Sequence, residues 1–218
     1  MYFIGNTKDV FTPKEFLGSG KEGNVYYKKN TNEAVKIYNG SDLNHKSLNE
    51  ETAKFLSGIP TTNILLPKRL VYDEQGSFIG YTTPFIQTYQ GVNNLELLDF
   101  KIPDLIKVIE PLYRDAYTLS MNKIYLRDIY SDGNCLYNGN FYLIDPGLYK
   151  IMPDDKMEIL KYNFLDLNGA LNIYILQMKI FDMETEMIKR GDYYNICDYL
   201  RDEGRPGETF ASLARRKG

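Results

Sequence analysis

Three glycines recur at fixed spacing in residues 17–25, which read LGSGKEGNV. Because Gly18, Gly20 and Gly23 carry no side chain, backbone N–H groups in this segment can approach phosphate oxygens closely. A dinucleotide-binding turn would need a helix directly after the third glycine. Residues 25–28 have the composition of a strand instead. The segment therefore predicts a glycine-rich hairpin that lies over the phosphates of a nucleotide.

A lysine interrupts the apolar run AVKIY at residues 34–38. Burying an ammonium inside a strand is costly unless an anion accompanies it, so we expect Lys36 to bind the α- and β-phosphates. The alternative is an edge-strand lysine that faces water. A carboxylate should hold Lys36 in place. Glu51 is the candidate, because it lies beside the expected apolar face of a helix over residues 48–56, whereas Glu50 is turned about 100° toward solvent.

In these features the sequence resembles the protein-kinase superfamily. The resemblance places a catalytic loop at Leu126-Arg127-Asp128, after a long expected helix, and a magnesium motif at Asp145-Pro146-Gly147, where an expected hairpin ends. The motifs follow one another in family order over residues 16–166, about two thirds of the chain.

The resemblance implies a role for each matched residue. Asp128 would orient the acceptor hydroxyl and take its proton late, with Arg127 and Lys36 completing the catalytic set. Asn134 and Asp145 would hold Mg²⁺, with Mn²⁺ as an alternative, between the phosphates of ATP. The implied ATP-binding residues are Gly18, Ser19, Gly20, Gly23, Val25, Ala34, Lys36, Glu51, Thr83, Phe85 and Ile86.

The sequence departs from the family pattern at several positions. Asn134 follows Asp128 by six residues, one more than the family spacing, so Asp132 stays open as the second metal ligand. Leu126 replaces histidine and Pro146 replaces phenylalanine, both at packing positions. Tyr130 stands where serine/threonine kinases carry a lysine, which leaves the acceptor class open.

The segment between Asp145 and Asp166 contains no serine or threonine. Arg127 therefore cannot pair with a phosphoserine or phosphothreonine there, and Asp154-Asp155 could supply a permanent negative charge instead. Alternatively, these residues cap a helix that begins near residue 156. The resemblance makes Asp166 the helix aspartate that pins the backbone of the catalytic loop, and a charge near a helix N-terminus is the alternative.

The pattern of elements predicts an α+β, bilobal protein-kinase-like fold. Its N-lobe, residues 1–88, would be a small antiparallel sheet with one helix, and its C-lobe, residues 89–218, would be shortened and mainly helical. The expected strands cover residues 25–28, 33–38, 64–72, 77–86, 135–137 and 141–144, and the expected helices cover residues 48–56, a long stretch from 103, 164–183 and 193–201.

Only 71 residues follow Gly147, which resembles minimal bacterial-type kinases, including secreted effector kinases and antibiotic-modifying phosphotransferases. We therefore expect an ATP-dependent phosphotransferase that acts on a protein Ser/Thr or Tyr hydroxyl. A small-molecule, aminoglycoside-type phosphotransferase is the second hypothesis. A pseudokinase that acts as a binding module is the third, and transfer of AMP also stays open. The second hypothesis needs an acidic pocket, for which the available residues are Asp182, Glu184, Glu186, Asp192 and Asp198.

Composition limits the partners. With 26 basic and 29 acidic residues the net charge is −3, which gives no bulk attraction for nucleic acid or an anionic membrane. Two cysteines and one histidine argue against a zinc site or a disulfide framework. We expect a cytoplasmic protein with ATP and a protein substrate as partners, and secretion as an effector is the alternative.

Overall fold

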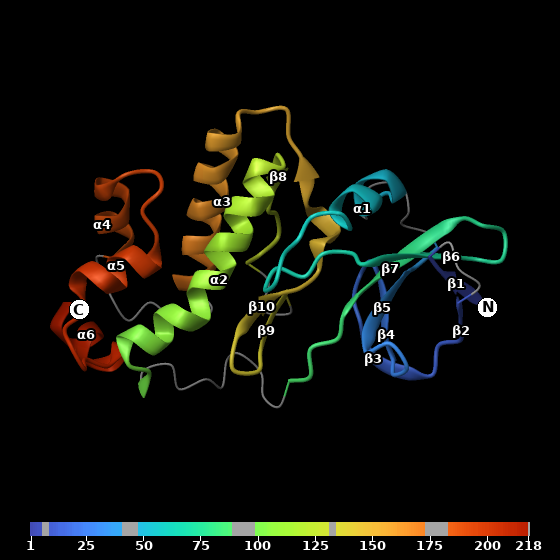
Figure 1. Cartoon of the computed structure of the whole chain (residues 1–218), viewed down its shortest axis with the longest axis horizontal. Coiled ribbons are helices and arrows are strands. Elements are labelled where there is room, and N and C mark those ends of the chain that lie inside the picture. The colour runs from blue at the N-terminus through green and yellow to red at the C-terminus, as the bar shows by residue number, and fades with distance from the viewer. Residues whose placement is uncertain (6–8, 41–47, 89–98, 131–133, 173–182, 218) are drawn as a thin grey trace. The chain divides into compact units, whose positions relative to one another are not determined.

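The computed structural model describes residues 1–5, 9–40, 48–88, 99–130, 134–172 and 183–217 (Figure 1). The chain separates into two compact units, neither of them contiguous in sequence. The first contains residues 1–61, 65–87 and 145–150, and the second contains residues 62–64, 88–144 and 151–218. Together they make a mixed α/β protein.

The first unit is built on a curled antiparallel sheet of seven strands, in the order β2-β1-β6-β7-β5-β4-β3 (Figure 1). Its strands are β1 (Tyr2–Ile4), β2 (Asp9–Phe11), β3 (Glu15–Ser19), β4 (Gly23–Lys28), β5 (Glu33–Tyr38), β6 (Arg69–Tyr72) and β7 (Phe78–Pro84). Apolar side chains from four of these strands form a core: Ile4, Phe11, Val35, Ile37 and Val71. The expected hairpin of residues 25–28 and 33–38 is confirmed as β4–β5.

The same sheet holds a buried charge network that is separate from Lys36. Glu33 is 1% exposed and pairs with Arg69, which also donates to Asp9 at 2.7 Å, and Lys28 pairs with Asp9 at 3.2 Å. Burial alone would raise the pKa of Glu33, but the hydrogen bonds from Arg69 and Thr31 lower it overall. Since each charge has a partner of opposite sign, we interpret this network as structural.

Helix α1 (Glu50–Leu56) begins at Asn49, whose side chain accepts the N–H of Thr52. Its buried residues are Ala53 and Leu56, whereas Phe55 is 43% exposed and Glu51 is exposed. The expected helix is confirmed, but its expected apolar face was wrong. In a helix of two turns, one apolar residue such as Phe55 on the solvent side is enough to rotate the inferred face.

The second unit is mainly helical, with helices α2 (Ile102–Met121), α3 (Lys156–Ala170), α4 (Met183–Arg190), α5 (Ile196–Glu203) and α6 (Phe210–Lys217). It also contains β8 (Ile124–Tyr125), β9 (Cys135–Tyr137) and β10 (Phe141–Leu143), and the chain further forms the short helix η4 (Pro146–Leu148) and β11 (Lys150–Ile151). The long helix from residue 103 and the hairpin of residues 135–137 and 141–144 are confirmed as α2 and β9–β10. Within the described residues, no helix combines the length and the apolar character needed to cross a membrane.

Two expected helices begin elsewhere than the sequence suggested. Asp155 caps the N-terminus of α3 by accepting the N–H of Met157, so this helix begins at residue 156 and not at 164. Residues 173–182 lie outside the described part of the chain. Asn195 caps α5 with a capping box, which sets its start at Ile196 and not at 193. The polar C-terminal end forms α6, which apolar spacing did not reveal.

A buried aspartate on α2 organises residues 62–64. Asp115 is 5% exposed, and its Oδ2 accepts the N–H groups of Thr62, Asn63 and Ile64 at 2.9, 2.6 and 2.8 Å. Asn63 in turn donates to the carbonyl of Phe141 at 2.7 Å. The expected strand over residues 64–72 is therefore shorter, and only Arg69–Tyr72 joins the sheet of the first unit.

Candidate active site

The glycine-rich segment forms the end of a hairpin between β3 and β4. Gly18 pairs with Val25 and Ser19 with Asn24, and the N–H of Gly20 donates to the carbonyl of Gly23 at 2.9 Å. A Cβ at Gly23 would lie 2.2 Å from the carbonyl oxygen of Ile37, so this glycine is needed for β4 to pack against β5. A Cβ at Gly18 or at Gly20 would meet no atom within 4 Å. Packing inside the protein therefore does not require glycine at these two positions. Close approach of a ligand to the backbone would require it.

The strand register places four of the expected ATP-binding side chains on one face of the sheet. Val25 opposes Lys36, which opposes Tyr81, and Ala34 opposes Thr83. Since directly opposed residues share a face and side chains alternate along a strand, Val25, Ala34, Lys36 and Thr83 lie together with Tyr81.

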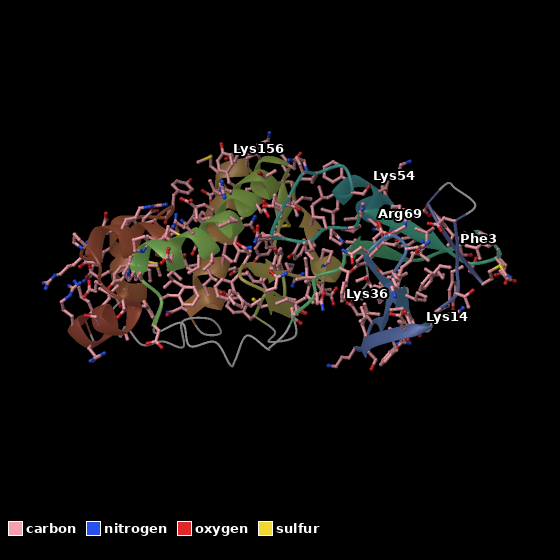
Figure 2. All side chains as sticks on the ribbon, turned by 60° about the horizontal axis from the view of Figure 1, so that its bottom comes forward. Phe3, Lys14, Lys36, Lys54, Arg69 and Lys156 are labelled. Carbon is pink, nitrogen blue, oxygen red and sulfur yellow. The ribbon has the colours of Figure 1, made fainter. Side chains whose placement is uncertain are left out.

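Lys36, labelled in Figure 2, is on β5 and is 8% exposed. Its ammonium lies between two carboxylates. Its Nζ donates to Oδ1 of Asp145 at 2.6 Å and to Oε2 of Glu22 at 2.8 Å. The hydroxyl of Tyr81 also donates to Oδ1 of Asp145, at 3.2 Å. Burial, followed by the nearby charge of Asp145, raises the pKa of Tyr81, so its phenol stays protonated and can donate. The alternative, an edge-strand lysine that faces water, is therefore wrong, since β5 lies between β7 and β4 in the sheet.

The carboxylate partner of Lys36 differs from the one we expected. Glu51 is exposed on α1, and the ion pairs that Lys36 makes with described residues are those with Glu22 and Asp145. The sequence signal for Glu22 was its place in the glycine-rich segment, beside the phosphates that this segment was expected to bind. An acidic residue within that segment was the missed signal.

Asp145 has a conformation that few residues adopt. Its backbone φ is +64°, in the left-handed region, and its side chain accepts the N–H of Gly147 at 3.2 Å. A Cβ on Gly147 would lie 2.6 Å from Oε2 of Glu22 and 3.0 Å from Oδ1 of Asp145. Gly147 therefore makes room for the carboxylates that meet at Lys36. All three hydrogen bonds to Asp145 end on Oδ1, so Oδ2 is without a partner among the described residues.

The remaining expected ATP-binding residues lie at the end of β7 and just beyond it. Thr83 is on the strand, and Phe85 stacks on Tyr27 with ring centroids 4.3 Å apart. The N–H of Phe85 donates to the carbonyl of Asn32 at 3.1 Å, so this donor is already used inside the protein. Ile86 follows and is half-buried.

In the second unit, Asp128 lies on a short loop after β8 and is exposed. Its backbone φ is +59°, and its carbonyl accepts a hydrogen bond from the amide of Asn134 at 2.8 Å. Left-handed conformations in non-glycine residues concentrate at functional sites, although aspartate tolerates them better than most residues. The Asp128 carboxylate makes no hydrogen bond or ion pair with any described residue. Asp132, the alternative metal ligand, lies outside the described residues.

Arg127 does not pair with Asp154-Asp155, the acidic residues expected to neutralise it. It is exposed, and it forms no ion pair with Asp154 or Asp155, all three being described. Asp155 is the N-cap of α3, which confirms the helix-capping alternative. Of the two tyrosines between Asp145 and Asp166, Tyr149 is only 3% exposed.

The backbone before Asp128 is pinned by an asparagine and not by Asp166. Asn163 on α3 is fully buried, and its Oδ1 accepts the N–H of Leu126 at 2.8 Å. Its Nδ2 donates to the carbonyl of Ile124 at 2.9 Å and to Oγ of Ser120 at 2.8 Å. The expected backbone role of Asp166 is thus wrong, and so is the N-terminal alternative, because Asp166 lies eleven positions after the N-cap of α3. A buried asparagine three residues before Asp166 was the missed signal.

The first unit supplies an ammonium on a sheet face, two carboxylates, and glycines that leave the backbone open. The second unit supplies an exposed aspartate on a firmly held loop. Groups of these types can bind phosphates and accept a proton from a hydroxyl. No protein-family model matches the sequence, and no curated protein matches it either.

Proposed function

We propose that the chain is an ATP-dependent phosphotransferase with a kinase-like fold, which moves the γ-phosphate to a hydroxyl group of a protein. The observation that carries the proposal is the ion pair between Lys36 and Asp145, which lies 109 residues further along the chain. Lys36 lies on the sheet face that also presents Val25 and Ala34. This cluster differs from the Glu33–Arg69 network because its two carboxylates outnumber its one ammonium, and charge clusters of this kind concentrate at functional sites. Phosphate binding would use the cluster.

Each group has a part in the proposed reaction. The ammonium of Lys36 neutralises negative charge on the phosphoryl oxygens, while the backbone at Gly18 and Gly20 approaches them. The carboxylate of Asp128 orients the acceptor hydroxyl and accepts its proton late in the transfer. Because little covalent chemistry is required of the protein, positioning and charge stabilisation account for most of the rate.

The oxygen donors suit magnesium. Oδ2 of Asp145 and Oδ1 of Asn134 have no partner among the described residues, and Mg²⁺ commonly takes one or two protein oxygens together with phosphate oxygens and water. Each of these oxygens is thus open to a ligand within its own unit, and the resemblance implies that Asp145 and Asn134 would hold the ion. When bound, the ion would neutralise charge on the phosphates.

A protein acceptor is favoured over an aminoglycoside-type acceptor because the candidate acidic pocket is already committed. Asp192 pairs with Lys161, Glu186 pairs with Lys189, and Asp198 pairs with Arg201. These carboxylates are on the surface of the helical unit and their charges are matched. Asp182 and the side chain of Glu184 lie outside the described part of the chain.

The test is incubation of the purified full chain with Mg²⁺ and ATP labelled at the γ or at the α position, with generic proteins and a panel of aminoglycosides as acceptors. We expect γ-label on protein. Asp145→Ala should lower the transfer by about a hundredfold or more, whereas the exposed Asp154→Ala, a matched control, should leave it unchanged. Transfer of α-label would indicate AMP transfer, and ATP binding without transfer would indicate a binding module. Full activity of Asp145→Ala would refute the mechanism.

A further inference from the structure

The loop that carries Asp128 is fastened to α3 by two tyrosine hydroxyls that converge on one carboxylate. Tyr125 donates to Oδ2 of Asp166 at 2.7 Å, and Tyr130 donates to Oδ1 of the same residue at 3.3 Å. These tyrosines lie on either side of Asp128 in the sequence. Both oxygens of Asp166 are therefore occupied, each by a different end of the loop.

Tyr130 packs against α3 at Gly169, where the absence of a side chain leaves space for its ring and hydroxyl. A Cβ on Gly169 would lie 2.8 Å from the Tyr130 hydroxyl oxygen and 3.0 Å from its ring. Glycine inside a helix costs about 1 kcal/mol relative to alanine, and Gly169 lies near the C-terminal end of α3 with its backbone φ outside the left-handed region. Contact with Tyr130 is the reason that the structure gives for a glycine at this position.

The loop that carries Asp128 needs these hydrogen bonds because the backbone conformation of Asp128 is energetically unfavourable. Asp128 has φ of +59°, and residues in sparsely populated backbone regions persist only when their surroundings hold them there. The side chains of Leu126 and Ile129, at 0% and 4% exposure, anchor the loop on either side of Asp128, which itself is exposed. The Tyr125–Asp166–Tyr130 contacts add a second restraint at each end.

We infer that Tyr125 and Tyr130 are positioning residues, which act through Asp166 to hold the Asp128 carboxylate in place for the proton transfer. The inference rests on the proposed function and adds to it, because it gives a role to Tyr130 at the position where serine/threonine kinases carry a lysine. Its hydroxyl is used for holding the loop. A catalytic carboxylate displaced by about 1 Å can cost about a hundredfold in rate, so the loss of one fastening contact should be visible in kcat.

The experiment compares Tyr130→Phe, Gly169→Ala and the double variant, with Tyr117→Phe on the exposed face of α2 as the matched control. We expect kcat for γ-phosphate transfer to fall about tenfold or more in both single variants, with KM for ATP within about twofold of the wild type. The double variant should lose no more than the worse single one, because both changes act on the same hydroxyl. Gly169→Ala should also keep or raise the melting temperature, since alanine favours the helix.

Several results would overturn the inference. One is a kcat within about twofold of the wild type in both Tyr130→Phe and Gly169→Ala. Another is a double variant in which the two reductions of kcat multiply. The third is a reduction of kcat that is accompanied by a matching fall in melting temperature or in ATP affinity. A wild-type chain that transfers no phosphate would refute the proposed function itself. An active wild type with normal variants would refute only the positioning role.

Discussion

Under the proposed function, Glu22 would compete with nucleotide phosphates for Lys36, and removal of its charge should tighten nucleotide binding. In the structure the ammonium of Lys36 has two carboxylate neighbours, so the cluster carries a net charge of −1. Phosphates that approach Lys36 must displace at least one of them. Asp145 is the proposed metal ligand, so Glu22 on the glycine-rich segment is the residue that has to move. Glu22→Gln keeps the shape of the side chain and removes its charge.

The expected size of the effect follows from the ion pair. The side chains of Lys36 and Glu22 are 10% and 20% exposed, so solvent screens the pair only in part. A hydrogen bond between charged groups contributes about 1.5–3 kcal/mol, and partial exposure with the remaining neutral acceptor reduces the net difference to about 1–2 kcal/mol. That corresponds to roughly 5- to 30-fold tighter binding of ADP or of an unreactive ATP analogue.

Isothermal titration calorimetry of the ATP analogue, ADP and adenosine against the wild type, Glu22→Gln and Glu51→Gln provides the assay. The gain should appear for the two phosphate-bearing ligands and be absent for adenosine, which does not reach Lys36. Glu51→Gln, the same substitution on the exposed face of α1, should bind all three as the wild type does. Weaker phosphate binding by Glu22→Gln would refute competition and show that Glu22 instead holds Lys36 in position.

Three further predictions follow from other contacts. Lys36→Ala and Asp145→Ala should each lower phosphoryl transfer by about a hundredfold or more, because they remove charge stabilisation, and thermal melts should show a folded protein. Asp115→Ala should lower the free energy of unfolding by about 3 kcal/mol or more in urea titrations, since three buried N–H groups lose their acceptor. Burial raises the pKa of both Cys135 and Cys197 to about 12, so these thiols should stay protonated at pH 8 and react with iodoacetamide only when urea unfolds the chain.

The sequence was most informative where a residue type had a local reason. Turn residues between β4 and β5, and Asn138-Gly139 between β9 and β10, place both hairpins where the structure has them. The long α2 follows from its apolar spacing and its early proline. In each case the decisive interactions lie within about ten residues, so a single segment contains the information.

Partner choice was less predictable, because partners come from distant segments. Lys36 could be recognised as needing an anion, but whether Glu51 or Glu22 supplies it depends on the rotation of α1, and Phe55 misled that assignment. The shortened strand β6 has a similar cause. Asp115 lies 51 residues beyond Ile64 in the sequence, and nothing near residues 62–64 indicates that a helix carboxylate will take their N–H groups.

The two residues Asn163 and Asp166 show why a family pattern can place a role correctly and assign it to the wrong side chain. The resemblance implied that an aspartate on this helix, Asp166, fixes the loop backbone, and in the structure Asn163 on α3 does so instead. A backbone that presents both an N–H and a carbonyl needs a partner that can accept and donate, which an asparagine can do and a carboxylate cannot. An uncharged amide also avoids the cost of burying a charge at a site with no exposure. Asp166, half-buried, is then left to accept from the two tyrosine hydroxyls, for which a carboxylate with two oxygens is the suitable group.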